Sequence, residues 1–209
     1  MSKIGILAVQ GDFAEHCQVF KCLGVEPIEV RLPEHLEGVR GLVIPGGEST
    51  TITKLMDLYG LTKAIKERAR SGMSVWGTCA GMIVVAHRIA EDGIQPLNLI
   101  DLDVRRNAFG RQVDSFEMDL AVPALGPAPF HAVFIRAPII ERLGSRVELL
   151  TQLEDGTPVA ACQGGVLVTA FHPELTGDTR FHGYFLKLAG IGQPVTGFDN
   201  PHKHSTPES

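Results

Sequence analysis

The sequence has no excess of basic residues, because 24 aspartates and glutamates outnumber 19 lysines and arginines and the net charge is −5 at pH 7. A nucleic-acid-binding surface needs a basic patch, so this class of partner is not expected. No apolar run approaches the roughly 20 residues of a membrane-spanning helix, and Lys3 leads directly into an apolar segment instead of a signal peptide. We therefore expect neither a membrane nor a nucleic-acid partner.

Cysteine is also scarce. The sequence has four, Cys17, Cys22, Cys79 and Cys162, and their positions show no CxxC or other metal-binding or disulfide-framework spacing. Unpaired thiols without such a pattern are typical of a reducing compartment. We expect a cytoplasmic protein that uses no metal and no cofactor.

The 209 residues, of which 44% are apolar, are enough for one substantial core. Residues 1–192 are predicted to form a single domain. The polar, proline-bearing segment 193–209 is predicted to be a disordered tail.

Strand and helix patterns alternate in the first half of the chain, which is typical of parallel strands joined by right-handed crossovers. After residue 99, short strand patterns follow one another with glycine or polar turns, which predicts an antiparallel extension. The sequence therefore predicts an α/β fold, with three layers and a mixed, mostly parallel central sheet flanked by helices. The predicted strands of the first half include residues 3–9, 27–31 and 41–44, and the predicted helices include 12–23, where Asp12 is a plausible N-cap, and 61–69.

The segment SVWGTCAGMIVVAH, residues 74–87, carries the strongest chemical signal. Cys79 stands between Gly77 and Gly81, where an apolar strand pattern changes to an apolar run of helical length. This matches a nucleophile elbow with Cys in place of Ser, in which side chains at the glycine positions would collide with the strand and the helix. Cys79 is expected to stand exposed at the helix start, where the helix dipole favours a thiolate. A small buried structural cysteine is the alternative.

His172, Pro173 and Glu174 follow the strand pattern at residues 166–171. In an extended backbone residues i and i+2 point to the same side, and Pro173 favours an extended His172. Glu174 would then orient His172 toward Cys79, which supplies a nucleophile, a base and an orienting group. A solvated surface turn is the alternative for the tripeptide alone. A zinc site is disfavoured because no downstream CxxC accompanies the HxE pattern.

The loop PGGES, residues 45–49, follows the strand pattern at 41–44. Its two glycines allow backbone N–H groups to turn inward, as an oxyanion hole requires. An ordinary tight turn, with Ser49 or Thr50 capping the next helix, is equally compatible. A phosphate loop is less compatible because GxxxxGK is absent. Since this loop and GTCAG both follow parallel strands, they are expected to face one another at the carboxyl edge of the sheet.

GTCAG, PGGES and the terminal HPE, in this order, resemble the class I (triad) glutamine amidotransferase family. More narrowly, the chain resembles the glutaminase subunits of pyridoxal 5'-phosphate synthase. This resemblance spans nearly the whole chain except the tail. It implies that the chain hydrolyses L-glutamine through a thioester and delivers ammonia to a (β/α)8-barrel synthase subunit in a hetero-oligomer. The stretches that carry the narrower resemblance are LAVQGDFAEH (7–16), RRNAFGRQVDSFE (105–117), FIRAP (134–138) and FHPELT (171–176).

The resemblance also implies roles for single residues. It implies Cys79 as the nucleophile, His172 as the acid and base, and Glu174 as the group that orients His172. Backbone donors at Gly47 and Ala80 are implied for the oxyanion hole. The edge at Gln10, Gly11 and His16 is implied to meet the synthase, and glutamine contacts are implied for Gly47, Glu48, Ser49, Arg106, Ile135 and Arg136.

Two other functions compete with this one. A stand-alone cysteine hydrolase of α/β-hydrolase type is disfavoured because there the acid precedes the histidine in the chain, whereas Glu174 follows His172. A noncatalytic binding module is disfavoured because Cys79, His172 and Glu174 are all present.

Overall fold

The computed structural model describes residues 3–91, 93–106 and 115–192. The predicted tail at 193–209 and most of the RRNAFGRQVDSFE stretch lie outside the described residues. Among the helices that the structure describes, none has the length and apolarity needed to cross a membrane.

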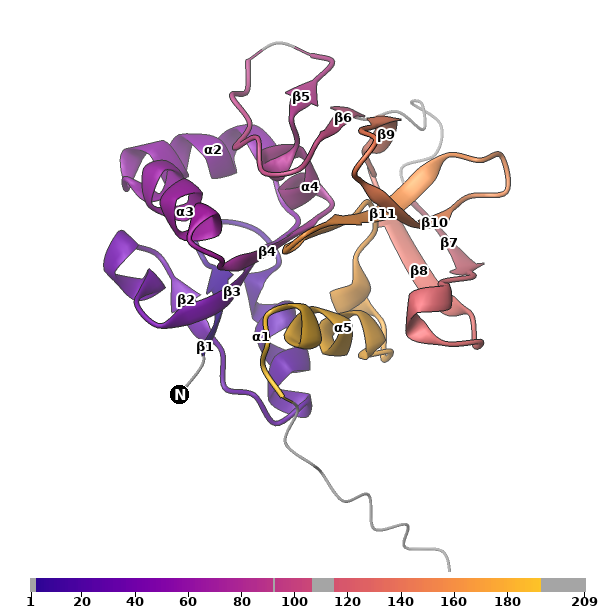
Figure 1. The fold of residues 1–209 in the computed structure, drawn as a ribbon, viewed down its shortest axis with the longest axis horizontal. Coiled ribbons are helices and arrows are strands. Elements are labelled where there is room, and N and C mark those ends of the chain that lie inside the picture. Colours follow the sequence, from indigo (N-terminus) through magenta and orange to yellow (C-terminus); the bar gives the residue numbers. More distant parts are fainter. Residues whose placement is uncertain (1–2, 92, 107–114, 193–209) are drawn as a thin grey trace, which may run out of the picture.

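A seven-stranded sheet forms the centre of the molecule, in the order β10-β11-β12-β4-β3-β1-β2 (Figure 1). The strands from β12 to β2 are parallel, whereas β10 and β11 extend the sheet as an antiparallel pair. The predicted mixed, mostly parallel sheet is confirmed. The strand bounds are β1 Lys3–Leu7, β2 Ile28–Val30, β3 Val39–Ile44, β4 Ser74–Thr78, β10 Glu148–Gln152, β11 Pro158–Gln163 and β12 Val166–Thr169.

Helices cover both faces of this sheet, which gives the three layers that the sequence predicts. Figure 1 shows α2, α3 and α4 on one side and α1 and α5 on the other. Every residue of β4 is buried, as expected for a parallel strand between two helical layers. The helix bounds are α1 Phe13–Cys22, α2 Ser49–Leu58, α3 Leu61–Arg70, α4 Ala80–Val85 and α5 Arg180–Leu188, with short 3-10 helices η1 Pro33–Leu36, η2 Pro123–Leu125 and η3 Pro173–Leu175.

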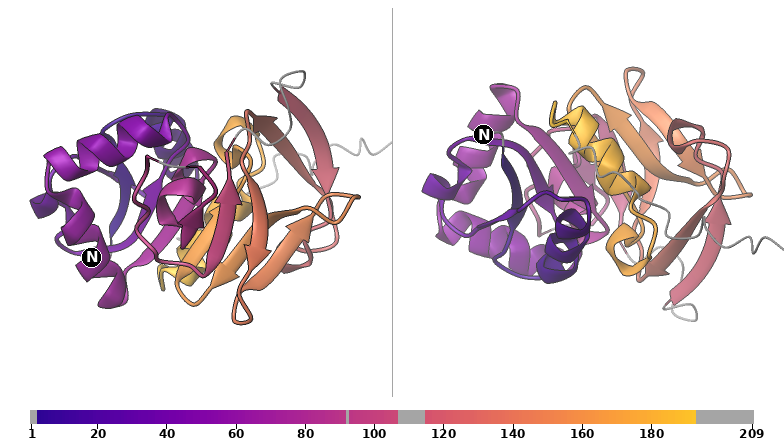
Figure 2. Two further views of the ribbon diagram at one scale, coloured as in Figure 1. Left: turned by 90° about the horizontal axis from the view of Figure 1, so that it is seen from above. Right: turned by 90° about the horizontal axis from the view of Figure 1, so that it is seen from below.

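Two smaller sheets complete the fold. Strands β5 (Arg88–Ile89), β6 (Leu102–Arg105) and β9 (Ile139–Leu143) form one, and the antiparallel pair β7 (Ser115–Leu120) and β8 (Phe130–Ile135) forms the other. Figure 2 shows β7 and β8 at the end of the molecule away from α2 and α3. The sequence does not predict β5, which is two residues long, or β9, whose partly exposed IIERL pattern lacks a regular alternation.

Aromatic side chains pack the central sheet against α5. Trp76 of β4 lies within 6.3 Å of Phe181 and 5.5 Å of Phe185 on α5, measured between ring centroids. All three side chains are fully buried. Burial of such large side chains is a main source of core stability, and it fixes β4, whose end carries Cys79.

Candidate active site

Cys79 occupies the turn between β4 and α4 in a strained conformation, with φ 47° and ψ −107°. A β-carbon at Gly77 would lie 2.4 Å from the carbonyl oxygen of Gly81, and one at Gly81 would lie 1.9 Å from that of Ile44. Side chains cannot be accommodated at either position, so the predicted need for both glycines is confirmed. Strain of this kind is characteristic of functional turns.

The predicted exposure of Cys79 is wrong, because only 7% of the residue is accessible. Its Sγ lies 3.7 Å from the carbonyl oxygen of Ile135, at the end of β8. Local sequence patterns cannot place β8 over the elbow, since the two segments are 56 residues apart.

His172 follows β12, and its backbone N–H donates to the carbonyl of Val133 at 2.8 Å. Its Nδ1 lies 2.8 Å from Oε1 of Glu174, and Cys79 is near enough to the ring to raise the pKa of His172. The structure thus brings together all three predicted catalytic residues. The expected extended backbone is wrong, because Pro173 begins η3 and the short helix, not a strand, carries Glu174 back toward the ring.

The charge on His172 is set by its two partners. Burial alone would lower the pKa of the ring, but the interactions with Cys79 and Glu174 outweigh burial and raise the pKa to about 10. An imidazolium stabilised in this way favours a thiolate beside it, which is the nucleophilic form of cysteine.

Glu174 is buried and remains ionised. Burial alone would raise the pKa of this carboxyl, but the facing rings of His16 and His172 hold it below its usual value. The carboxylate therefore keeps its role as an acceptor for His172 at neutral pH.

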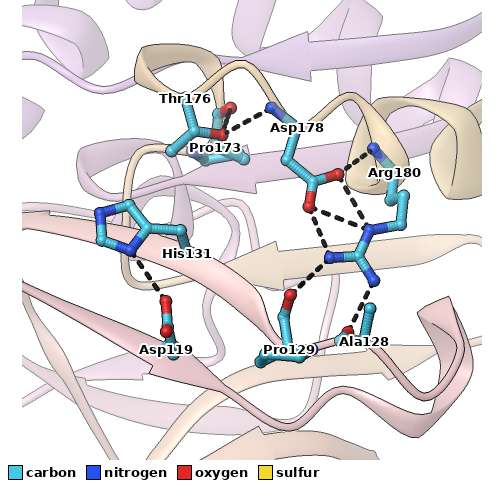
Figure 3. Close-up of polar contacts among 8 residues, drawn as sticks. All are labelled: Asp119, Ala128, Pro129, His131, Pro173, Thr176, Asp178 and Arg180. Atoms are coloured by element: carbon cyan, nitrogen blue, oxygen red, sulfur yellow. Dashed lines mark hydrogen bonds and ion pairs between the residues drawn. The ribbon is translucent and has the colours of Figure 1, made fainter.

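The start of α5, which follows Glu174 in the chain, is hydrogen-bonded to the loop before β8 (Figure 3). Arg180 pairs with Asp178, and its guanidinium donates to the carbonyl oxygens of Ala128 and Pro129, both at 2.7 Å. A guanidinium presents several donors in a fixed plane, so one side chain ties the loop before β8 to the start of α5.

The PGGES loop lies beside the triad. A β-carbon at Gly46 would lie 2.4 Å from Cε1 of His172, so the ring leaves no room for a side chain at this position. Gly47 has a φ of 150°, which favours glycine. The Gln10 side chain accepts from the backbone N–H of Glu48 at 2.8 Å and thereby holds the loop against the end of β1.

Residues with predicted glutamine contacts gather near the loop. Oε1 of Glu48 accepts from the Thr50 hydroxyl at 2.8 Å and from Arg106 at 3.2 Å. The Thr50 hydroxyl, and then Arg106 and Arg136, lower the pKa of Glu48 although partial burial opposes them. A carboxylate and two guanidinium groups here suit the ammonium and carboxylate of an amino acid.

The other predicted contact residues differ in accessibility. Ser49 is buried, whereas Ile135 is 38% exposed and presents its carbonyl to Cys79. Arg136 has a left-handed φ of 44°, which turns the chain sharply after β8. Ile135 therefore lies at the triad itself, and Arg136 acts electrostatically on Glu48.

Asp12, in the β1–α1 connection, and His16, in the first turn of α1, belong to the site although the sequence predicts other roles for them. Asp12 stands at the N-cap position of α1, but its side chain makes no capping hydrogen bond, and Oδ2 lies 3.5 Å from Nδ1 of His172. The pKa of Asp12 is raised above its ordinary value, and burial is the main cause. The prediction that His16 meets a partner is wrong, because the residue is fully buried with Nε2 3.3 Å from Oε2 of Glu174. A polar residue shortly after a buried parallel strand is the signal that could have placed Asp12 here, whereas no such local signal marks His16 within α1.

Asp12, His172 and Glu174 bring ligand-type atoms within 4.8 Å of one another. Nδ1 of His172 is already hydrogen-bonded to Glu174, whose Oε1 is thereby occupied. This arrangement suits a base with orienting carboxylates better than a set of metal ligands.

The chain matches one protein family over nearly its whole length. The model of the SNO glutamine amidotransferase family matches residues 6–189. Pyridoxal 5'-phosphate synthase subunit PdxT of Herpetosiphon aurantiacus is 59% identical over 188 residues, covering 88% of this chain and 99% of the relative. The PdxT subunit of Dehalococcoides mccartyi is 56% identical over 194 residues, covering 92% and 100%.

Solved structures show the same fold. A crystal structure of a glutamine amidotransferase superposes with a TM-score of 0.86 at 52% identity, covering 90% of this chain and 99% of the other. A chain in the structure of PurLQS from Thermotoga maritima has a TM-score of 0.67 at 13% identity, covering 90% and 99%. The second likeness is one of fold alone.

Proposed function

Because the chain belongs to the SNO glutamine amidotransferase family, we propose that Cys79, His172 and Glu174 are the triad with which it hydrolyses L-glutamine to L-glutamate and ammonia. The chain is a glutaminase that serves pyridoxal 5'-phosphate synthesis, the formation of vitamin B6. The observation that carries the triad is the position of His172, which is hydrogen-bonded to the buried Glu174 and whose pKa is raised by Cys79 at the strained elbow.

The first half of the reaction forms a thioester. The Cys79 thiolate attacks the side-chain amide carbon of glutamine, and the carbonyl electron pair moves onto oxygen. Backbone N–H groups of Gly47 and Ala80 stabilise this oxyanion. His172, as imidazolium, donates its proton to the amide nitrogen, the carbon–nitrogen bond breaks, and ammonia leaves.

The second half releases glutamate. Neutral His172 takes a proton from water, and the resulting hydroxide adds to the thioester carbon. Collapse of this intermediate breaks the carbon–sulfur bond and restores the Cys79 thiolate beside protonated His172. Glu174 holds the ring in position throughout and keeps its own charge.

Glutamine is held by the groups around the PGGES loop. Glu48 receives the substrate ammonium, and Arg106, with Arg136 nearby, receives the α-carboxylate. The hydrogen bond between Arg106 and Glu48 supports this assignment, because it places both charges at one end of the site. Ser49 and Ile135 line the same site. The buried Ser49 backs the loop, and the Ile135 carbonyl lies next to the sulfur.

The ammonia passes to a (β/α)8-barrel synthase subunit in a hetero-oligomer. Gln10 and Gly11 belong to the docking edge, and the bond from Gln10 to the Glu48 backbone links that edge to the oxyanion loop. A cytoplasmic location is part of the same proposal, supported by the four free cysteines.

The comparisons do not support a stand-alone cysteine hydrolase. The experiment that separates the two functions supplies the chain with glutamine, with and without a pyridoxal 5'-phosphate synthase barrel subunit, and in parallel with a p-nitrophenyl ester. Ammonia formed in the presence of the synthase subunit is expected. Ester cleavage by the chain alone, without glutamine turnover in either mixture, would contradict the proposal.

A further inference from the structure

Two buried histidines stand behind the triad and have no part in the chemistry described above. His16 of α1 and His182 of α5 are both fully buried. Nε2 of His16 lies 3.3 Å from Oε2 of Glu174 and 3.3 Å from the Thr78 hydroxyl. Nδ1 of His16 lies 3.0 Å from Nε2 of His182. A line of polar atoms therefore runs from α5 through α1 to the carboxylate that orients His172.

The hydrogen-bonding partners decide which nitrogens carry protons. One arrangement has His182 donating from Nε2 to Nδ1 of His16, which leaves an N–H at Nε2 of His16 facing Glu174 and the Thr78 hydroxyl, each 3.3 Å away. The opposite arrangement would turn a lone pair of His16 toward the carboxylate. It would also place an N–H at Nδ1 of His182, an atom without a hydrogen-bond partner among the described residues. A buried unpaired donor and a repulsion between lone pairs are both costly, so the first arrangement is favoured.

We propose that His16 is a positioning residue for Glu174 and that His182 fixes the His16 tautomer that faces the carboxylate. This rests on the proposed glutaminase triad. Oε2 of Glu174 has no hydrogen bond of standard geometry among the described residues, and the His16 ring supplies an N–H 3.3 Å away. Oε1 is then free to serve His172 alone.

The favoured arrangement needs both rings neutral, and burial favours the neutral form of each. Burial lowers the pKa of His16, although Glu174 opposes the shift, and burial lowers the pKa of His182 well below its ordinary value. The other titratable groups that act on His16 are His172, Asp12 and Glu15. A neutral ring can turn its N–H toward the carboxylate without adding a second positive charge beside His172.

Aromatic packing holds the rings in this orientation. The His182 ring lies edge-on to Trp76 and to Phe20, with centroids 4.9 Å and 5.0 Å apart. The His16 ring lies edge-on to Trp76 at 5.6 Å. Neither ring can rotate without disturbing the core between the sheet and α5.

Replacing His16 by Gln or by Asn distinguishes a role in positioning Glu174 from a role in packing alone. In His16→Gln the amide nitrogen takes approximately the place of Nε2 and can still donate to Glu174, whereas His16→Asn reaches only the place of Nδ1. Glutamate formation is measured with the full-length chain and a synthase barrel subunit. His16→Asn is expected to lower kcat roughly 10- to 100-fold with an unchanged KM, less than the roughly 10⁴-fold that loss of an orienting carboxylate costs. His16→Gln is expected to stay within a fewfold of the unaltered chain.

The second readout needs no synthase subunit. The ring nitrogens of His172, in histidine-labelled protein, are titrated by NMR and assigned with His172→Gln. His16→Asn is expected to lower the titration midpoint of His172, because a loosened Glu174 stabilises the imidazolium less, and His16→Gln is expected to leave the midpoint unchanged. The groups facing His172 in this titration are Cys79, Glu174 and Asp12.

The outcomes are distinguishable from failure of the triad itself. If the unaltered chain makes no glutamate with the synthase, the proposed function fails, while the titration still tests His16. Equal kcat and equal His172 midpoints in both amide variants would overturn the positioning role. If His16→Asn does not fold, His182→Phe against His182→Gln replaces it. In His182→Phe both kcat and the titration midpoint of His172 are then expected to fall. Equal values of kcat and of the midpoint in His182→Phe and His182→Gln would overturn the proposal.

Discussion

Nδ1 of His172 and Oε1 of Glu174 lie 2.8 Å apart, and Glu174 is the second residue of a 3-10 helix that begins at the proline between them. The two residues therefore reach one another through a tight turn of fixed backbone. Because Glu174 is buried, the contact is sheltered from water and holds the ring at one angle.

Replacing Glu174 by Gln tests this contact. The neutral amide cannot stabilise an imidazolium, so the pKa of His172 should fall from about 10 and protonated His172 should be lost at lower pH. Glutamate formation with the synthase subunit should drop about 10²- to 10⁴-fold, with the alkaline limb of its pH profile moved to lower pH. Glu117→Gln removes an exposed carboxylate paired with His131 and serves as the control. An unmoved alkaline limb in Glu174→Gln would show that this contact does not set the charge of His172.

The elbow glycines should be irreplaceable. In Gly81→Ala the new β-carbon would lie 1.9 Å from a backbone oxygen of Ile44, so the strand and α4 must separate. We expect the free energy of unfolding in urea to fall by about 3 kcal/mol or more. Gly177→Ala is the matched control because a β-carbon there meets no atom within 4 Å. Equal stability of the two variants would contradict the described packing of the elbow.

Substitutions of two neighbouring arginines distinguish a loss of substrate binding from a general loss of surface charge. Arg106 pairs with Glu48 in the site, whereas Arg105 pairs with Glu141 away from it. Arg106→Ala should raise the KM for glutamine roughly tenfold or more with a smaller effect on kcat, since it removes a charged contact to the ground state. Steady-state kinetics of Arg106→Ala and Arg105→Ala check this, and equal KM values for the two variants would remove Arg106 from the binding site.

Acid stability should depend on His182. Its folded pKa lies well below the unfolded value of about 6.5, so below that pH the unfolded chain binds a proton that the folded chain does not. The free energy of unfolding therefore falls as pH drops below about 6.5. His182→Gln should lessen this slope by about 1.4 kcal/mol per pH unit, as measured by urea unfolding between about pH 6 and 5. An unchanged slope would mean that His182 is protonated in the folded protein.

The sequence predicts the central sheet and the triad because both depend on local patterns. Apolar runs mark buried parallel strands wherever they occur, and a glycine-flanked cysteine after such a run indicates an elbow. The carboxyl ends of parallel strands share one edge, which is why Cys79 and His172 can be placed together without knowledge of the strand order.

The remaining features depend on contacts between distant segments. Local patterns do not indicate that β8 covers Cys79, or that His16 turns inward against Glu174 instead of outward to a partner. The rule for residues before proline constrains His172 but not the residues that follow it, so the turn at Pro173 escapes prediction. Asp12 fits the composition of a helix cap, and its contact with His172 becomes visible only when β1 and β12 are placed in one sheet.

Glutamate release by Cys79→Ala, measured with glutamine and the synthase barrel subunit, tests the central claim most directly. Without the sulfur no thioester can form, so turnover should fall by about 10⁴-fold or more while the far-ultraviolet circular dichroism spectrum is unchanged. Cys22→Ser, which alters an exposed cysteine on α1, should retain full activity. Turnover by Cys79→Ala close to that of Cys22→Ser would contradict the account.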